Sequence, residues 1–238
     1  MAIFGANIEK IKLNGRLITA VDLVRDGARF ADVGTDHAYL PIYLMNMGKI
    51  ESAIASDINR GPLERAQENI EKHGFSEKIK TVLCDGLSKV EQYDPDDVAI
   101  FGMGGELIVK IIDEAKWLRD PIEKKRIILQ PMTHAEKVRE YLAREGFCII
   151  DEILSYDRGK IYQTICAEYD GISRSFDALT LTLGEHIIKK GGNLFSELVK
   201  TLKKQTERKL EGKKSGGEPT DEEKEMLASL SDILEEEK

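Results

Sequence analysis

Residues 30–41, FADVGTDHAYLP, combine a short apolar strand, a polar turn and the start of a helix. The turn crowds four polar side chains around one glycine, Gly34: Asp32, Thr35, Asp36 and His37. A simple connection needs far fewer polar groups, and open α/β sheets bind ligands where strands end. The stretch therefore predicts one strand–turn–helix unit of an α/β fold with a ligand above the turn.

The same strand–helix alternation continues to about residue 170. Expected strands lie at 30–33, 52–57, 79–85, 98–101, 126–130, 147–154 and 161–169. Helices between the first strands imply crossovers, hence a mostly parallel sheet covered on both faces. Only SYDRGK separates the last two strands, which predicts an antiparallel hairpin at one edge. We expect a doubly wound α/β domain over residues 1–170.

Residues 171–238 are predicted to form a second, helical domain. Leucines four or eight apart place one helix after Leu194, and GKKSGGEP at 212–219 is expected to end it. Thr220 with Glu223 then forms a capping-box pattern for a second helix, as Thr133 with Glu136 does in the first domain. The two C-terminal helices are expected to fold back as an antiparallel, coiled-coil-like pair.

The two C-terminal helices carry opposite charge. Residues 189–214 hold nine Lys or Arg and three Glu, a net of +6 (9 − 3), whereas residues 218–238 hold nine Asp or Glu and two Lys, a net of −7 (2 − 9). One interpretation is a solvated hairpin whose helices attract each other. The other is an arm that contacts phosphates. Charge alone favours the hairpin.

Composition indicates an ordinary globular protein of 238 residues, 41% hydrophobic and 33% charged. No apolar run approaches the roughly 18 residues of a membrane span, and the first 16 residues lack the order of a signal peptide. Cys84, Cys148 and Cys166 lie in apolar runs and are expected to be core thiols. These features predict a cytoplasmic protein with no membrane or metal partner, and they leave the oligomeric state open.

Polar or glycine-rich loops follow the first five expected strands. Besides the turn at Gly34, these loops contain Asp57-Ile58, Asp85-Gly86, Gly102-Met103-Gly104-Gly105 and Gln130-Pro131. A carboxylate at the end of the second strand, Asp57, can accept both hydroxyls of a ribose. Asp85 can accept the exocyclic amino group of an adenine. Aspartates at three successive strand ends predict a nucleoside-bearing cofactor.

The turn at Gly34 argues against a dinucleotide. Both the G-x-G-x-x-G fingerprint and the P-loop pattern are missing from the sequence. A pyrophosphate requires bare backbone amides, yet Asp36 stands in the turn. Carboxylates suit a cofactor with an ammonium and a sulfonium, so the residues favour S-adenosylmethionine over NAD, with its methionine end above the turn.

Six motifs together resemble the bacterial tRNA (adenine-22-N1)-methyltransferase family. They are ADVGTDHAYLP (31–41), ASDINRGPL (55–63), CDGL (84–87), FGMGGELI (101–108), LQP (129–131) and GKIYQTICAE (159–168). The resemblance covers about residues 12–170. It implies a class I S-adenosylmethionine-dependent methyltransferase with a Rossmann-like domain and a C-terminal coiled-coil-like domain, acting on N1 of adenosine 22 in tRNA.

The resemblance also implies site residues. Those for the cofactor are Asp32, Gly34, Asp36, His37, Asp57, Ile58, Asp85, Gly86, Gly102 and Met103. The GMGG loop stands in place of the Asn/Asp-Pro-Pro-aromatic motif of many amino-group methyltransferases, which fits a ring nitrogen as the target. Phe101 occupies a position where the family commonly has alanine, a mild departure.

Methylation of adenine N1 needs no base, because the nitrogen is neutral at pH 7 and has an in-plane lone pair. In-line placement of the reactants, worth roughly 7–11 kcal/mol, then dominates catalysis. Asp36, next to His37, is the candidate for stabilising the emerging cation. An equally weighted alternative is that Asp36 only caps the next helix or binds the cofactor ammonium. Gln130 is the second catalytic candidate, as a partner of the adenine Watson–Crick edge.

A tRNA substrate requires local basic surface on a chain with a formal charge of −8. Arg16 and Arg25, with Lys10 and Lys12, are expected beside the cofactor turn. Further substrate-binding candidates are Lys200, Lys203 and Lys204 for phosphates and Tyr162 for stacking on a base. Adenosine 22 lies inside folded tRNA, so its base must be exposed or flipped.

Two other functions stay open at this point. A small-molecule methyltransferase would use the same cofactor site and would need no basic helical arm. A nucleotide-binding scaffold protein would bind the cofactor without turnover on any RNA, and its C-terminal helices would dock a partner protein.

Overall fold

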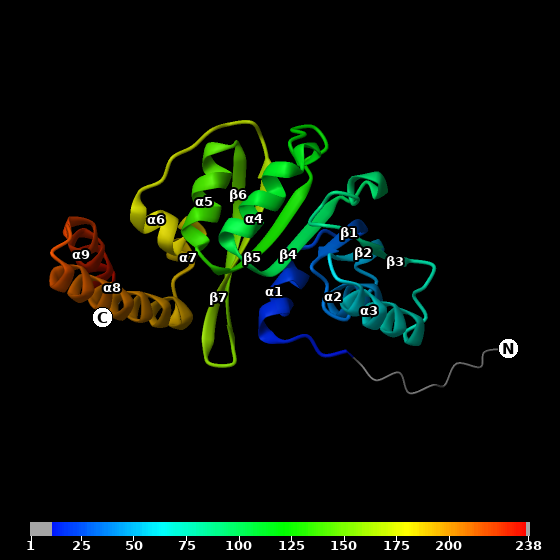
Figure 1. The fold of residues 1–238 in the computed structure, drawn as a ribbon, viewed down its shortest axis with the longest axis horizontal. Coiled ribbons are helices and arrows are strands. Elements are labelled where there is room, and N and C mark those ends of the chain that lie inside the picture. Colours follow the sequence, from blue (N-terminus) through cyan, green and yellow to red (C-terminus); the bar gives the residue numbers. More distant parts are fainter. Residues whose placement is uncertain (1–10, 237–238) are drawn as a thin grey trace.

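The computed structural model describes residues 11–236, and a seven-stranded sheet forms its centre (Figure 1). The strands are β1 (Ala28–Val33), β2 (Ile50–Asp57), β3 (Ile79–Leu83), β4 (Asp97–Gly104), β5 (Arg126–Thr133), β6 (Phe147–Asp157) and β7 (Lys160–Tyr169). Their spatial order is β3-β2-β1-β4-β5-β7-β6, with β1 to β5 parallel and β6 and β7 antiparallel. The predicted doubly wound sheet and its edge hairpin are confirmed.

Helices cover both faces of the sheet (Figure 1). The helices of this part are α1 (Gly15–Leu23), α2 (Tyr39–Asn46), α3 (Arg60–Lys72), α4 (Gly105–Glu114) and α5 (Ala135–Arg144), with short 3₁₀ turns η1 (Glu91–Tyr93) and η2 (Lys116–Leu118). Alternation along β1 sends Phe30 into the core with α1, α2 and α3, and sends Ala31 and Val33 into the core with α4 and α5. Burial on both faces explains why Phe30, Ala31 and Val33 are apolar although they point to opposite sides of the sheet.

The predicted capping box of α5 is wrong. Strand β5 continues to Thr133, and the residue that precedes α5 is His134, in a left-handed conformation with φ of 57°. The Glu136 carboxylate contacts the His134 ring (3.0 Å) instead of reaching back to Thr133. Thr133 is part of β5 and pairs with Gly104 of β4, so it does not cap α5.

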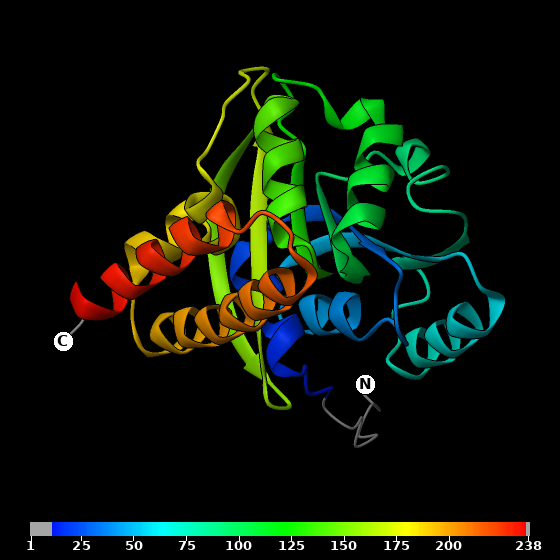
Figure 2. The same cartoon turned by 60° about the vertical axis from the view of Figure 1, so that its left-hand side comes forward.

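The C-terminal helices are α6 (Ala178–Leu183), α7 (Glu185–Lys190), α8 (Asn193–Gly216) and α9 (Asp221–Glu236). Figure 2 shows α8 and α9 side by side as the predicted antiparallel pair. Helix α8 runs through most of the expected break and ends at Gly216, where Gly217 adopts a left-handed conformation. The predicted division at residue 170 coincides with the end of β7 and stays a prediction.

A third apolar cluster joins these helices to the β6–β7 hairpin. Its buried members include Leu183, Phe195, Val199 and Leu230, and Ile161 of the hairpin packs against them. The capping box predicted for α9 is wrong, because Glu223 forms ion pairs with Lys209 (2.9 Å) and Lys213 (2.8 Å) of α8. These ion pairs join α8 and α9 close to the turn that connects the two helices.

One buried ion pair ties the sheet to the C-terminal helices. Arg139 of α5 and Glu152 of β6 are at most 1% exposed, and Nε lies 2.6 Å from Oε1. Arg139 also donates to the Leu181 carbonyl at the end of α6 (2.8 Å), while Glu152 accepts from the His186 amide at the start of α7 (3.1 Å). The pair therefore fixes α6 and α7 on the sheet.

The cysteines are free thiols, with Cys84 and Cys166 buried and Cys148 half-buried. None of the helices between residues 11 and 236 is long and apolar enough to cross a membrane. Over the same range, His, Cys, Asp and Glu side chains nowhere gather in threes in a way that could hold a metal ion.

Candidate active site

The turn after β1 folds back onto the neighbouring strands. The Gly34 and Thr35 amides both donate to the Ser56 carbonyl of β2, at 2.8 and 2.9 Å. Gly34 has a φ of +74°, and a Cβ atom there would lie 2.3 Å from Cε of Met103 near the end of β4. A glycine is required because the backbone is left-handed and the turn approaches β4 closely. The first and fourth strand ends thus share one site.

Carboxylates converge at this turn. Asp32 is 6% exposed and accepts a 2.6 Å hydrogen bond from the Thr35 hydroxyl. Burial raises the pKa of the Asp32 carboxyl to about 6, the Thr35 bond opposes the rise, and the charges of Asp36 and Asp57 add to it. The charges of Asp36 and Asp57 therefore disfavour ionised Asp32, and a cationic ligand nearby would oppose that effect.

Asp36 and His37 lie on the solvent side of the turn. The Asp36 carboxylate is 81% exposed and lies 3.3 Å from Nε2 of His37, whose ring stacks on Tyr39. The residue before α2 is Ala38, and no side chain caps that helix. The alternative that Asp36 caps the helix is therefore wrong, while its carboxylate is free to face a ligand.

The second and third strand ends supply the other predicted cofactor residues. Asp57 is half-buried, and its Oδ1 accepts the Asn59 amide at 2.7 Å, which fixes the carboxylate at the edge of the sheet. Ile58 is 60% exposed, so it offers an apolar surface next to that carboxylate. Asp85 is exposed and Gly86 follows it in the loop after β3. The arrangement fits a ribose at Asp57 and an adenine beside Ile58 and Asp85.

Gln130 does not lie where the sequence analysis expects it. Its side chain is fully buried, with Oε1 accepting the Gly102 amide (3.2 Å) and Nε2 donating to the Pro131 carbonyl (3.0 Å). Because both ends of the amide are used inside the protein, the predicted contact with an adenine edge is wrong for this conformation. Gln130 instead positions the loop that begins at Gly102.

Arg16, at the start of α1, reaches the same edge of the sheet. Its Nη1 lies 3.5 Å from Sδ of Met132, and a Cβ atom at Gly102 would meet that nitrogen at 2.6 Å. Within residues 11–236 the guanidinium forms no ion pair. The predicted place of Arg16 beside the cofactor loops is confirmed, and its charge is available to a ligand.

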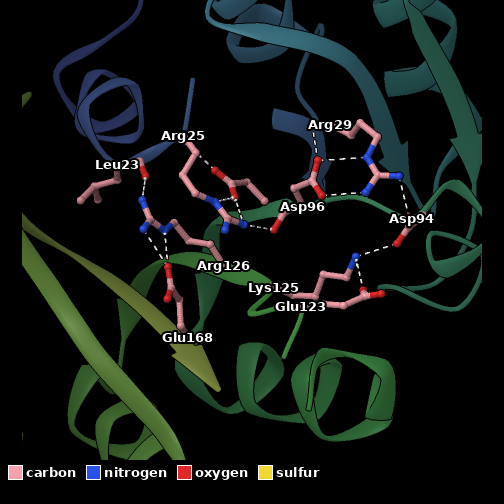
Figure 3. Close-up of polar contacts among 10 residues, drawn as sticks. Leu23, Arg25, Arg29, Asp94, Asp96, Glu123, Lys125, Arg126 and Glu168 are labelled. Carbon is pink, nitrogen blue, oxygen red and sulfur yellow. Dashed lines mark hydrogen bonds and ion pairs between the residues drawn. The ribbon is translucent and has the colours of Figure 1, made fainter. Parts of the chain in front are cut away.

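Arg25 lies where the parallel strands begin, at the opposite end of β1 from the turn at Gly34. Its predicted place beside that turn is therefore wrong. Figure 3 shows it in a network of charges where β1, β4 and β5 begin. Its backbone amide and Nε bind the carboxylate of Asp97 at 2.7 and 2.6 Å, and Nη2 binds the Asp96 carbonyl. Asp97 is fully buried, and burial raises the pKa of its carboxyl while Arg25 opposes the rise. Arg25 is therefore a structural residue.

The same network contains further ion pairs near the strand starts. Arg29 binds Asp96, and Arg126 binds Glu168 of β7 and the Leu23 carbonyl of α1 (Figure 3). These pairs hold the amino-terminal edge of the sheet together, away from the aspartate loops. Of the other basic residues expected near the turn, Lys10 lies outside the described residues and Lys12 is exposed.

A cleft of about 780 Å³ brings two predicted substrate residues together. Tyr162 of β7 and Lys200 of α8 both line it, although 38 positions separate them in the sequence (200 − 162). Lys203 and Lys204 follow on α8 but do not line the cleft. Met132, at the end of β5, lines the cleft and also contacts Arg16. Met132 is not among the predicted site residues, because the LQP motif ends at Pro131.

Residues 13–165 match a family described as "Methyltransferase domain". The chain is 37% identical over 178 residues to the tRNA (adenine(22)-N(1))-methyltransferase of Bacillus subtilis, covering 74% of each protein. The solved M1A22 tRNA methyltransferase of B. subtilis has a TM-score of 0.76 and 33% identity, with 94% of this chain and 97% of that chain covered. A Streptococcus pneumoniae protein solved in complex with S-adenosyl-L-methionine has a TM-score of 0.81 and 30% identity, with 94% and 100% covered.

Proposed function

The chain belongs to the tRNA (adenine-22-N1)-methyltransferase family, and we propose on this premise that it transfers a methyl group from S-adenosylmethionine to N1 of adenosine 22 in tRNA. One observation on the aspartates supports the proposal on chemical grounds. Asp36 and Asp57 lie close enough to Asp32 for their charges to raise the pKa of its carboxyl, and burial raises that pKa most. A cofactor with positive charge and a ribose fits such a site.

We propose the following roles in cofactor binding. Asp57 holds the ribose hydroxyls and Asp85 accepts the adenine amino group, with Ile58 against the adenine face. Asp32 and the turn at Gly34 hold the methionine ammonium, and His37 and Met103 border it. When bound, S-adenosylmethionine supplies an electrophilic methyl group on a sulfonium. The glycines at 34, 86 and 102 let Met103, Ile111 and Arg16 approach the backbone of this site closely.

The chain's own part in the reaction is placement and electrostatics. Gln130 accepts a hydrogen bond from the Gly102 amide and so positions the end of β4 that borders the reacting atoms. Asp36, with its exposed carboxylate, stabilises the positive charge that the methylated adenine acquires. No residue has to remove a proton before attack, because adenine N1 is unprotonated at neutral pH.

We propose that tRNA lies across both parts of the chain. Residues 1–170 hold the cofactor, and residues 171–238 add a basic surface through Lys200, Lys203 and Lys204. Arg16 contacts a phosphate next to the target base. Lys209 and Lys213 are already bound to Glu223, so the proximal half of α8 is the part available to phosphates. A tRNA substrate also means that the protein acts in the cytoplasm.

The decisive test is transfer of labelled methyl to two unmodified tRNA transcripts that carry adenosine or guanosine at position 22. Labelling only of the adenosine transcript, lost in Asp57→Ala, is expected. The matched control is Asp26→Ala, which removes an exposed carboxylate at the opposite edge of the sheet. Cofactor binding without labelling of either transcript would contradict the proposal.

A further inference from the structure

The cleft between β5, the β6–β7 hairpin and α8 begins one strand away from the proposed methyl-transfer site. Met103 and Gly104 pair directly with Pro131 and Thr133 of β5, and the cleft starts at Pro131. Neighbouring strands lie about 4.8 Å apart. A polymer whose reacting residue lies above β4 therefore has a short, continuous path into the cleft, past Arg16 and Met132.

The lining of the cleft combines tyrosines, ammonium groups, a carboxylate and an amide. The side chains that matter are Tyr156, Tyr162, Lys160, Lys200, Glu197 and Gln205. Tyr156 is 57% exposed and Tyr162 is half-buried, so aromatic surface is available on the hairpin. Lys160 and Lys200 have no ion-pair partner anywhere in the part of the chain that the structure describes.

This mixture fits nucleotides better than a simple anion. Ammonium groups suit phosphates, and tyrosine faces suit stacked bases. A site for phosphate alone would be weakened by the Glu197 carboxylate, whereas a carboxylate and an amide can pair with the amino groups on base edges. Those edges and faces are accessible only when the nucleotides are unpaired.

We propose that this cleft binds the unpaired nucleotides that neighbour the target adenosine, and thereby makes methylation depend on their bases. The inference rests on the proposed function and adds a second recognition site to it. Tyr162 stacks on the neighbouring base, and Lys160 and Lys200 contact its flanking phosphates. Glu197 and Gln205, from α8, face the base edges across the cleft from the hairpin.

The location of the free charges supports this assignment. On α8, Lys209 and Lys213 bind Glu223 of α9, whereas Lys200 faces the cleft. On the opposite wall, the His134 ring contacts Glu136 (3.0 Å), which leaves Lys160 as the free cation of that side within residues 11–236. Free cations thus lie on both walls of the cleft, which suits a strand that passes between them.

The first experiment tests whether Tyr162 stacks on a base next to adenosine 22. Full-length tRNA transcripts with an abasic nucleotide immediately 5′ or 3′ of adenosine 22 are methylated by the wild-type chain and by Tyr162→Ala. Loss of one stacked base should lower kcat/KM of the wild-type chain about tenfold for one of the two transcripts. The same transcript should be methylated by Tyr162→Ala no more slowly than the intact tRNA.

The second experiment compares two pairs of lysines. The double variant Lys160→Gln/Lys200→Gln should raise KM for tRNA and reduce the slope of log KM against log salt by about 1.4, two phosphates at about 0.7 each. The control Lys72→Gln/Lys124→Gln removes two exposed charges outside the cleft and should change neither quantity. S-adenosylmethionine affinity, measured by calorimetry, should be unchanged in both double variants.

Each outcome has a distinct meaning. Independent effects of the abasic nucleotide and of Tyr162→Ala, together with an unchanged salt slope in the cleft double variant, would overturn the cleft proposal. Failure of the wild-type chain to methylate intact tRNA would instead overturn the proposed function. Context-dependent methylation that disappears in the Tyr162 and lysine variants supports both.

Discussion

Nη1 of Arg16 lies 3.5 Å from Sδ of Met132, which places the first helix of the chain at the border between the cofactor loops and the cleft. Arg16→Ala should therefore lower kcat/KM for tRNA by about 10- to 100-fold, as expected for a lost hydrogen bond to a charged group. S-adenosylmethionine affinity should stay within about twofold, since Arg16 contacts the loop from the substrate side. Steady-state kinetics and calorimetry on the same preparations measure the two effects.

Arg16→Lys is the informative companion variant. A lysine keeps the charge but lacks the planar fork, so activity should recover only in part. Loss of cofactor affinity in either variant would show that Arg16 supports the cofactor loops and not the substrate.

The buried Asp32 predicts a pH dependence of stability. Its pKa rises from 3.8 to about 6 on folding, so its favourable contribution is present below the lower value and is lost as the pH rises through about 6. Asp32→Asn removes this loss and still accepts the Thr35 hydroxyl. Relative to wild type, the variant should gain about 1–1.5 kcal/mol between about pH 5 and about pH 8. Urea unfolding at several pH values measures the gain.

Cofactor binding should report on the same carboxyl. A cationic ligand favours ionised Asp32, so binding near pH 6 should release a proton. Calorimetry in two buffers of different ionisation enthalpy detects this release, and it should be absent in Asp32→Asn. Equal proton release in the variant would assign the titration to another group.

The α8–α9 hairpin should be sensitive to acid through Glu223. Hydrogen bonds from Lys213 and then Lys209 lower the pKa of its carboxyl from 4.5 to about 2. Since the folded value is depressed, the stabilisation is present above 4.5 and is lost as the pH falls towards 2. Amide chemical shifts of α9 should change over this range in the wild-type chain and not in Glu223→Gln. The exposed neighbour Glu222→Gln is the control and should behave as wild type.

The Arg139–Glu152 pair should dominate the attachment of the C-terminal helices. Arg139→Met leaves Glu152 buried without its partner and should reduce the free energy of unfolding by about 3–5 kcal/mol. Arg139→Met/Glu152→Gln should recover part of this loss, because no uncompensated charge remains. A double variant that is no more stable than the single variant would assign the effect to the carbonyls of residues 181–183.

Arg25, unlike Arg16, should contribute to the stability of the chain and not to tRNA binding. Arg25→Ala removes two side-chain hydrogen bonds, one of them to the buried Asp97 carboxylate, and should destabilise the chain by about 2 kcal/mol. KM for tRNA and its salt dependence should not change, because the residue lies at the far edge of the sheet (Figure 3). A weaker tRNA interaction in a folded Arg25→Ala protein would contradict this placement.

Local pattern was sufficient to predict the strands and the loops after β1, β2 and β3, whereas the predicted loops at Gly102 and Gln130 lie inside β4 and β5. Apolar runs bounded by Gly and Asp predicted β1 to β5, and the parallel arrangement then predicts that their polar ends meet at one edge. Arg25 shows where proximity in sequence misleads. The six residues of β1, at about 3.3 Å each, carry the chain from one edge of the sheet to the other between Arg25 and Gly34.

The directions of side chains could not be predicted in the same way, and neither could a cleft whose walls come from distant parts of the sequence. The position of Gln130 at a strand end does not tell whether its amide points to solvent or, as found, to the Gly102 amide. The cleft is built from residues near 131–136, 156–163 and 197–205, and no single stretch contains a signal for it. Only the tertiary arrangement brings Tyr162 and Lys200 together.

The strand order also has a consequence for synthesis on the ribosome. β1 can pair with β2 early, but its other neighbour, β4, begins at residue 97, and β5 pairs with β7 and not with the intervening β6. A nascent chain must therefore keep one edge of β1 unpaired until β4 begins 64 residues later (97 − 33), and one edge of β5 until β7 begins 27 residues later (160 − 133), and such edges invite aggregation. Folding of the sheet is complete only once the β6–β7 hairpin has been made, whereas α8 and α9 need only each other and that hairpin as a platform.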